Sequence, residues 1–172
     1  MPGEHATQAT TIAALVYDAG IDPAPAMENF VRALQERGIA LAGAIQHNEG
    51  SCSMSLEILP SGLRMPISQN LGSCASGCRL DSVALAEASS LVRMSLATSP
   101  KLALFNKFGA QEAAGKGMHE EMAAAATAGI PILTAVSQTL MKEWLDFTGG
   151  ESVQLACSAE AALAWWEGLA QG

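Results

Sequence analysis

The stretch Thr11-Ile-Ala-Ala-Leu-Val-Tyr17, followed by Asp18-Ala-Gly20, decides the fold of this chain. Its apolar run is too short for a helix and stops at a glycine-containing turn, which together predict a buried strand. A helix is predicted directly afterwards, over about residues 25–37, because apolar residues recur there at helical spacing and Gly38 follows as a C-terminal cap. The apolar face of that helix consists of Met27, Phe30, Val31 and Leu34. The chain therefore begins with a strand, a turn and a helix.

The same unit recurs along the chain. Buried strands are predicted at residues 39–45, 101–105, 130–136 and 153–157, and helices at 82–98, 111–128, 137–147 and 158–169. Between the second strand and the second helix, Met54–Leu59 and Leu63–Ile67 alternate apolar and polar residues around a Pro-Ser-Gly turn, which predicts an antiparallel hairpin. Strands that alternate with helices favour an α/β fold of three layers, a mostly parallel sheet with helices on both faces. We therefore predict a single α/β domain over residues 11–172 that includes the β-hairpin insertion, after a flexible N-terminal tail at 1–10.

Composition and charge argue against several classes of function. The chain has nine Lys and Arg against seventeen Asp and Glu, a net charge of −8, which opposes binding to nucleic acid or to an anionic membrane surface. No stretch reaches the ~18 apolar residues of a spanning helix, and the N-terminus has no secretion signal. We therefore expect a cytoplasmic protein whose four cysteines are free thiols.

The segment Ser68–Asp81 is the longest predicted loop, and loops of this length in compact domains are often functional. It gathers small residues, hydroxyls, thiols and one guanidinium, a combination suited to wrapping backbone amides around an anion, with Arg79 as the counter-charge. The alternative is an irregular connection with buried cysteines and an ion pair between Arg79 and Asp81. The predicted anion-binding residues of this loop are Ser73, Cys74, Ser76, Gly77, Cys78 and Arg79.

Two further candidates lie at the end of a predicted strand. Asn106 and Lys107 directly follow the apolar run at 101–105, and ligands of parallel sheets bind at the carboxyl ends of the strands. We predict that Lys107 meets a phosphate or another oxyanion there, with an ordinary surface lysine as the alternative. The next polar residues have the spacing of a solvated helix face, namely Gln111, Glu112, Lys116 and His119.

The cysteines also allow a metal site. Cys74 and Cys78 are four residues apart and Cys52 lies on the adjacent hairpin, so these three thiolates could hold a metal ion. His47 could complete such a site with Cys52, although a histidine in a polar turn is more often only solvated. No serine–histidine–aspartate or cysteine–histidine pattern of nucleophilic catalysis can be defended in the sequence.

Several segments resemble known proteins. The order strand, turn, helix, followed by Gly38–Gln46, resembles the phosphate-loop nucleoside triphosphatase fold. More closely, Cys78–Asp81, Phe105–Gly117 and Gly129–Val136 resemble a family of small bacterial proteins of unassigned function, over residues from about Ile12 to Gly150. Members of that family are often labelled nucleoside-triphosphatase-like or molybdenum ABC transporter ATP-binding proteins. The resemblance implies a phosphate-loop-like fold, and its labels imply molybdate as a ligand or a role connected with the molybdenum cofactor.

The first turn lacks the groups that a working phosphate-binding loop requires. Such a loop needs glycines whose amides approach the phosphates, a lysine, and a hydroxyl for Mg²⁺. Asp18–Ala26 has one glycine, no lysine and no hydroxyl, and Pro23 and Pro25 remove two amide donors. Asp18 and Asp22 would repel a triphosphate. A degenerate loop is therefore predicted, and ATP hydrolysis does not follow from the fold.

These observations favour a non-hydrolytic binding or accessory protein for a small oxyanion, molybdate among them, or for a phosphorylated ligand. One alternative is a divergent nucleotide-binding hydrolase that uses Lys107 or Arg79 in place of the missing lysine. Another is a thiol-based metal carrier. Trp165 and Trp166 are adjacent on the last predicted helix and cannot both face the core, which favours a homo-oligomer. A protein that takes part in the maturation of molybdenum enzymes is the alternative partner.

Overall fold

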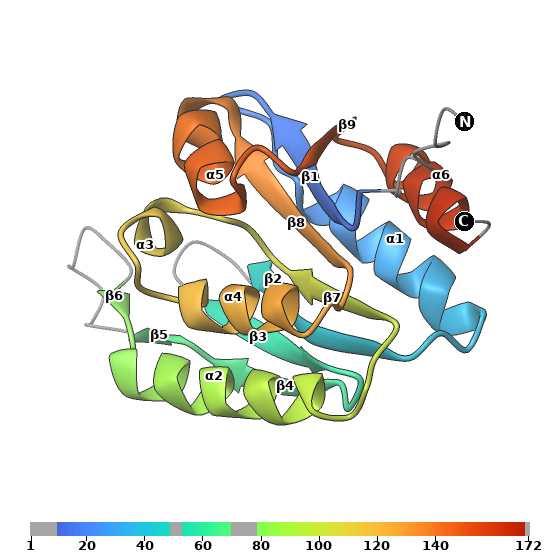
Figure 1. Ribbon diagram of the computed structural model, residues 1–172. Coiled ribbons are helices and arrows are strands. Elements are labelled where there is room, and N and C mark those ends of the chain that lie inside the picture. The colour runs from blue at the N-terminus through green and yellow to red at the C-terminus, as the bar shows by residue number, and fades with distance from the viewer. Residues whose placement is uncertain (1–9, 49–52, 70–78, 171–172) are drawn as a thin grey trace, which may run out of the picture.

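The computed structural model describes residues 10–48, 53–69 and 79–170 (Figure 1). The predicted tail at 1–10 lies outside this range except for Thr10. The strands are β1 (Ile12–Tyr17), β2 (Leu41–Asn48), β3 (Met54–Leu59), β4 (Leu63–Pro66), β5 (Ser68–Gln69), β6 (Arg79–Leu80), β7 (Leu102–Phe105), β8 (Ile132–Ser137) and β9 (Val153–Ala156). The helices are α1 (Ala24–Glu36), α2 (Ser82–Leu96), α3 (Ala110–Ala113), α4 (His119–Thr127), the 3₁₀ turn η1 (Gln138–Leu140), α5 (Met141–Thr148) and α6 (Ala159–Ala170).

Seven of these strands form one sheet in the order β4-β3-β2-β7-β8-β1-β9. The five strands from β2 to β9 along this order are parallel, and β3 and β4 add an antiparallel hairpin beside β2. The predicted hairpin is therefore confirmed as an extension of one sheet edge. The parallel strands all end at the same edge of the sheet, which is where ligands of such sheets bind.

Helices cover both faces of the sheet, which confirms the three-layer prediction (Figure 1). On one face α1 and α6 enclose a core with Phe30, Leu34 and Ala162. On the other face α2, α4 and α5 enclose a second core with Val92, Met122 and Trp144. None of the described helices is long and apolar enough to cross a membrane.

Two helix ends show why the elements stop where the sequence predicts. Gly38 has a φ of +71°, and the amide of Ile39 donates to the carbonyl of Leu34, so α1 ends in a left-handed cap. At the start of α2, Asp81 Oδ1 accepts hydrogen bonds from the amides of Val83 and Ala84 at 3.0 and 3.2 Å. Asp81 is therefore the N-cap of α2.

Asp81→Ala is expected to lower the free energy of unfolding by about 1 kcal/mol, because two amides of the first turn lose their acceptor. Chemical denaturation would measure the change. Asp81→Asn is the matched control, since its side-chain oxygen still caps the helix and it should cost only a few tenths of that amount. Equal losses in both variants would contradict the capping role.

One predicted helix is wrong in its extent. Residues 111–128 were expected to form one helix, whereas the structure has α3 and α4 with a connection at 114–118 between them. Gly115 and Gly117 have φ values of +80° and +57°, and the amide of Lys116 donates to the carbonyl of Gln111, which ends α3. Glycine adopts this left-handed backbone without a steric penalty, so the two glycines break the helix. The connection forms one wall of the candidate site.

Candidate functional site

Two hollows lie at the carboxyl edge of the parallel strands. The first, here called the polar hollow, has a volume of about 320 Å³ and lies between the turn after β1 and the ends of β2 and β7. Backbone and polar side chains make up most of its lining. Its walls are Tyr17, Gly20, Ile21, Asp22, Pro23, Ala24, Gln46, Asn48, Asn106 and Lys107.

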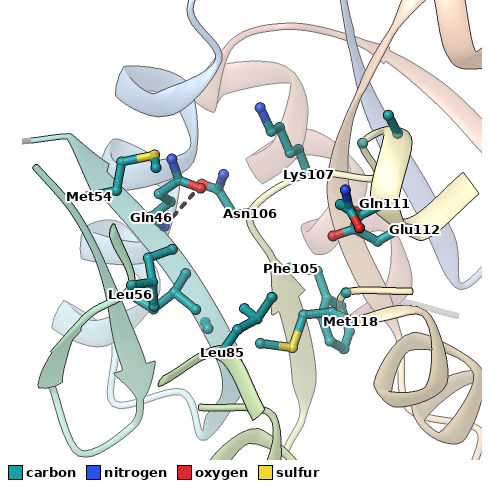
Figure 2. A pocket seen from close by; sticks show the side chains of 15 residues that line it. Gln46, Met54, Leu56, Leu85, Phe105, Asn106, Lys107, Gln111, Glu112 and Met118 are labelled. Carbon is teal, nitrogen blue, oxygen red and sulfur yellow. Dashed lines mark hydrogen bonds between the residues drawn. The ribbon is translucent and has the colours of Figure 1, made fainter. Parts of the chain in front are cut away.

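The second hollow, here called the apolar cavity, has a volume of about 280 Å³ and lies between β2, β3, α2 and the α3–α4 connection. Figure 2 shows Leu56, Leu85, Phe105 and Met118 gathered on one side and the polar side chains on the other. Its apolar lining is Ala44, Met54, Leu56, Ile67, Leu85, Phe105 and Met118. Its polar rim is Gln46, Asn106, Lys107, Gln111 and Glu112.

Asn106 and Lys107, both predicted from the sequence, lie where the two hollows meet, since they line both of them. The side-chain oxygen of Asn106 accepts a hydrogen bond from the amide of Gln46 at 3.0 Å, which ties the end of β7 to β2. That bond fixes the orientation of the Asn106 amide group. Within the described ranges its NH₂ group makes no hydrogen bond, so two donors stay available to a ligand.

Lys107 is exposed, and it makes no hydrogen bond or ion pair with the residues that the structure describes. Among those residues it is also the only cation that lines either hollow. Several other basic residues among those described, by contrast, form ion pairs with acids. Arg93, for example, donates to Glu121 at 2.9 Å. An unpaired ammonium at the carboxyl edge of a parallel sheet is suited to hold an anionic group.

Glu112 is the acid nearest to this lysine in the apolar cavity. Burial raises the pKa of the Glu112 carboxyl above its ordinary value, while the backbone amides of Glu112, Gly109 and Met118 and the ammonium of Lys107 act in the opposite direction. The carboxyl lies close against the α3–α4 connection, because a Cβ on Gly117 would come within 2.9 Å of Glu112 Oε1. Glu112 therefore faces the lysine across the cavity rim and holds the connection in place.

Glu112→Gln is expected to flatten the pH dependence of stability. The raised pKa means that the folded chain binds this proton more tightly than the unfolded chain does. The contribution of the protonated carboxyl is therefore fully present below the ordinary pKa of 4.5 and is lost as the pH rises through the folded value. Denaturation at a series of pH values from about 4 to about 7 should show wild type losing stability relative to the variant. Glu87→Gln, which removes an exposed carboxyl on α2, controls for net charge, and equal pH slopes in all three proteins would refute this role.

The turn after β1 is held by hydrogen bonds between its own residues. Asp22 Oδ1 accepts from the amide of Ala24 at 3.0 Å, and the carbonyl of Asp18 accepts from the amide of Ile21 at 3.1 Å. The first amide of α1 is thus occupied by a carboxylate of the chain itself, at the position where a phosphate would need donors. The prediction of a degenerate phosphate loop is consistent with this geometry.

Asp22 also contributes to raised pKa values of two neighbouring side chains, Tyr17 and Cys157. Burial first, then the negative charges of the ionised Cys157 sulfur and of the Asp22 carboxylate, raise the pKa of Tyr17. Burial and then Asp22 likewise raise the pKa of the Cys157 thiol. Since the thiolate is the form that binds metals and attacks electrophiles, Cys157 is held in its less reactive form.

Most of the predicted loop site lies outside the described residues. These residues are Ser73, Cys74, Ser76, Gly77 and Cys78, together with Cys52 of the predicted metal site. Arg79 is described only by its backbone, which pairs with Gln69 between β5 and β6. The anion site in this loop and the three-thiolate site therefore stay predictions.

His47 is described, and its contacts are acidic. Its Nδ1 lies 3.2 Å from Glu28 Oε1 and its Nε2 lies 3.4 Å from Glu57 Oε1. Throughout residues 10–48, 53–69 and 79–170, no three His, Cys, Asp or Glu side chains are grouped closely enough to hold a metal ion. The histidine thus joins α1 to the hairpin.

Three polar residues of the site were missed from the sequence. Gln46 follows the buried run of β2 just as Asn106 follows that of β7, so the rule of strand ends could have selected it. Gln111 and Glu112 were assigned to a solvated helix face; Gln111 is exposed, whereas Glu112 is half-buried, and both line the apolar cavity. Gly115 has a positive φ, which no helical spacing reveals, and the connection that follows it adds Gly117 and Met118 to the lining of the cavity.

The sheet order, with β1 between β8 and β9, gives an α/β fold like that of the phosphate-loop nucleoside triphosphatases, and the turn after β1 lacks the lysine and the hydroxyl of a phosphate loop. Residues 12–165 match the family described as proteins of unknown function, DUF2478, and the chain belongs to this family. The predicted resemblance is thereby confirmed.

Two individual proteins are similar to this chain. The Molybdenum import ATP-binding protein ModC 2 of Bradyrhizobium diazoefficiens is 38% identical over 160 residues, which are 90% of this chain and 18% of that protein. The chain thus spans less than a fifth of the length of this curated relative. The crystal structure of THEP1 from Aquifex aeolicus matches with a TM-score of 0.64 and 9% identity, over 92% of this chain and 96% of that one. At that identity the likeness shows the fold alone.

Proposed function

We propose that this chain binds a small anionic ligand at Lys107 without hydrolysing it, in a role connected with molybdenum. The observation that carries the proposal is the unpaired ammonium of Lys107 where the two hollows meet, with the free amide donors of Asn106 beside it. An exposed lysine of this kind supplies charge, and the adjacent NH₂ group supplies directed hydrogen bonds. The predicted loop residues Ser73 to Arg79 would extend the same site.

The absence of hydrolysis is supported by the turn after β1. Phosphoryl transfer in this fold class depends on backbone amides and a lysine around the phosphates, with a metal to neutralise the developing charge. Here Asp22 occupies the first amide of α1 and repels a polyphosphate, and Pro23 and Pro25 have no amide hydrogen to donate. Asn106 and Lys107 take the place after β7 where a metal-binding acid would be needed.

Molybdate is the first ligand to test, because the curated relative that shares this segment is named for molybdenum import. Titration calorimetry of the full chain with molybdate, tungstate and phosphate should show saturable binding to at least one of them. Lack of heat and of saturation with every oxyanion would overturn the proposal.

A divergent nucleotide-binding hydrolase is the second candidate, and the same relative's name, which includes ATP binding, favours it. This alternative predicts Mg²⁺-dependent release of phosphate from a nucleoside triphosphate, lost in Lys107→Ala. We expect no release above the blank for any of the common nucleotides, because the turn after β1 has no cradle for the phosphates. A turnover that depends on Lys107 would replace the binding proposal with the enzymatic one.

A further inference from the structure

The apolar cavity has an apolar wall on one side and a polar rim on the other. Leu56, Leu85, Phe105 and Met118 form an apolar wall, whereas Asn106 and Lys107 lie at the opposite rim (Figure 2). Leu56, Phe105 and Met118 are buried, so this wall is part of the protein's interior packing and not a patch of loose surface side chains. A cavity of about 280 Å³ lies near the lower end of the volumes of small-molecule sites.

A bare oxyanion uses only one end of this cavity. Molybdate or phosphate would be held at Lys107 and Asn106, but its strongly hydrated oxygens gain nothing from contact with leucine, phenylalanine and methionine side chains. An organic group on the anion would remove both its own apolar surface and that of the cavity from water. The arrangement of charge at one end and apolar wall at the other matches an amphiphilic ligand.

We propose that the ligand of this site is a small organic anion, with a body of one or two rings in the apolar cavity and its acidic group on Lys107. This inference rests on the proposed anion binding at Lys107 and names the class of anion. The volume sets the size of the body, and the NH₂ donors of Asn106 orient the acidic group toward the rim. Gln111 and Glu112 belong to the same polar rim and can hydrogen-bond a polar edge of the body.

Three probes separate the two ends of the ligand. Inorganic phosphate carries the charge alone, 1-naphthol carries the body alone, and 1-naphthyl phosphate carries both. On the wild-type chain, 1-naphthyl phosphate is expected to bind more than about tenfold tighter than either of the other two, because only it uses both ends. Calorimetry or naphthyl fluorescence would give the three dissociation constants.

Variants of α2 test where the body lies. Leu85, half-buried, lines the cavity, and Leu85→Trp fills it, so the advantage of 1-naphthyl phosphate over inorganic phosphate should disappear while phosphate affinity stays within about twofold. Leu85→Ala, which removes wall area without adding bulk, should reduce that advantage in the same direction. Val83→Trp is the matched control, because Val83 lies on the same helix and is 67% exposed. Unchanged phosphate affinity in each variant also reports that it is folded.

The outcomes separate this inference from the proposed function. Equal affinities for phosphate and 1-naphthyl phosphate would overturn the organic ligand and leave anion binding intact. Binding of 1-naphthol as tight as that of 1-naphthyl phosphate, unaffected by Lys107→Gln, would overturn the organic anion at Lys107, as would a lack of binding of 1-naphthyl phosphate. Only a failure of molybdate, tungstate and phosphate to bind would overturn the proposed function as well. An advantage of 1-naphthyl phosphate that survives Leu85→Trp would also overturn the placement of the body in this cavity.

Discussion

Gly43→Ala is expected to destabilise the protein by at least about 3 kcal/mol, enough to leave much of it unfolded. Gly43 lies within β2 at a φ of +106°, a backbone conformation that residues with a side chain rarely adopt. A Cβ at this position would lie 1.8 Å from the carbonyl oxygen of Leu104 on β7, a backbone atom that cannot turn aside. The two central strands would therefore have to separate.

Two hydrogen bonds hold the backbone of β2 at Gly43 against α2. The amide of Gly43 donates to Ser95 Oγ at 3.3 Å, and that hydroxyl donates to the carbonyl of Val92 at 2.7 Å. Ser95 is one of the few buried polar side chains among the described residues, and this pair of bonds satisfies it. The link joins β2 to α2, which form two walls of the apolar cavity.

Gly38→Ala is the matched control for this prediction. Gly38 also has a positive φ, +71°, but a Cβ there would meet no atom within 4 Å. Only the backbone penalty of about 1–2 kcal/mol should therefore appear. Urea denaturation of both variants, with circular dichroism as the signal, would measure the difference. Equal destabilisation would mean that the approach of Leu104 does not matter.

Lys107→Gln is expected to weaken binding of a small anion at least tenfold, which is about 1.4 kcal/mol. The variant loses the single cation that lines either hollow within the described residues, while the side-chain length and the hydrogen-bonding capacity are largely kept. Charged hydrogen bonds to an anion contribute about 1.5–3 kcal/mol, so the loss could reach a hundredfold. Stability should hardly change, because Lys107 is exposed.

Lys101 supplies the control for charge. It is also exposed, and it directly precedes β7, so it lies at the amino end of the strand that Lys107 follows. Lys101→Gln changes the net charge by the same amount at the opposite edge of the sheet. Calorimetric titration with the best-binding oxyanion should show a loss for Lys107→Gln alone. Similar weakening in both variants would indicate a general charge effect and no site at Lys107.

The layers of the fold could be predicted because they follow from local patterns. The short apolar run at Ile12–Tyr17 predicts a strand, and the helical spacing after it predicts a helix, without any knowledge of the tertiary contacts that each makes. Gly38 and Asp81 end and begin helices through bonds to residues within five positions of themselves, so their roles are also local. The break at Gly115 and Gly117 was not predicted, because glycines weaken a helix in any context and only the packing decides whether they break it.

The site could be predicted only in part. The position of Asn106 and Lys107, which line both hollows, could be predicted because a polar pair directly after a buried strand lies at the ligand-binding edge of a parallel sheet. Their partner Gln46 is 60 residues away, and that contact depends on β2 and β7 being neighbours in the sheet. No spacing in the sequence states which strands pair. Glu112 was missed for a related reason, since its burial depends on what packs across from it.

The first strand, turn and helix are therefore the part that the sequence determined by itself. Prolines lack an amide hydrogen and aspartates carry a negative charge in any conformation. The residue types of Asp18–Ala26 are therefore enough to predict that this turn lacks the donors of a phosphate-binding loop. The apolar cavity, the unpaired state of Lys107 and the raised pKa of Glu112 were decided by the tertiary structure. The cavity and the raised pKa of Glu112 arise because β2, β3, α2 and the α3–α4 connection come together only in the fold and bury the Glu112 carboxyl there.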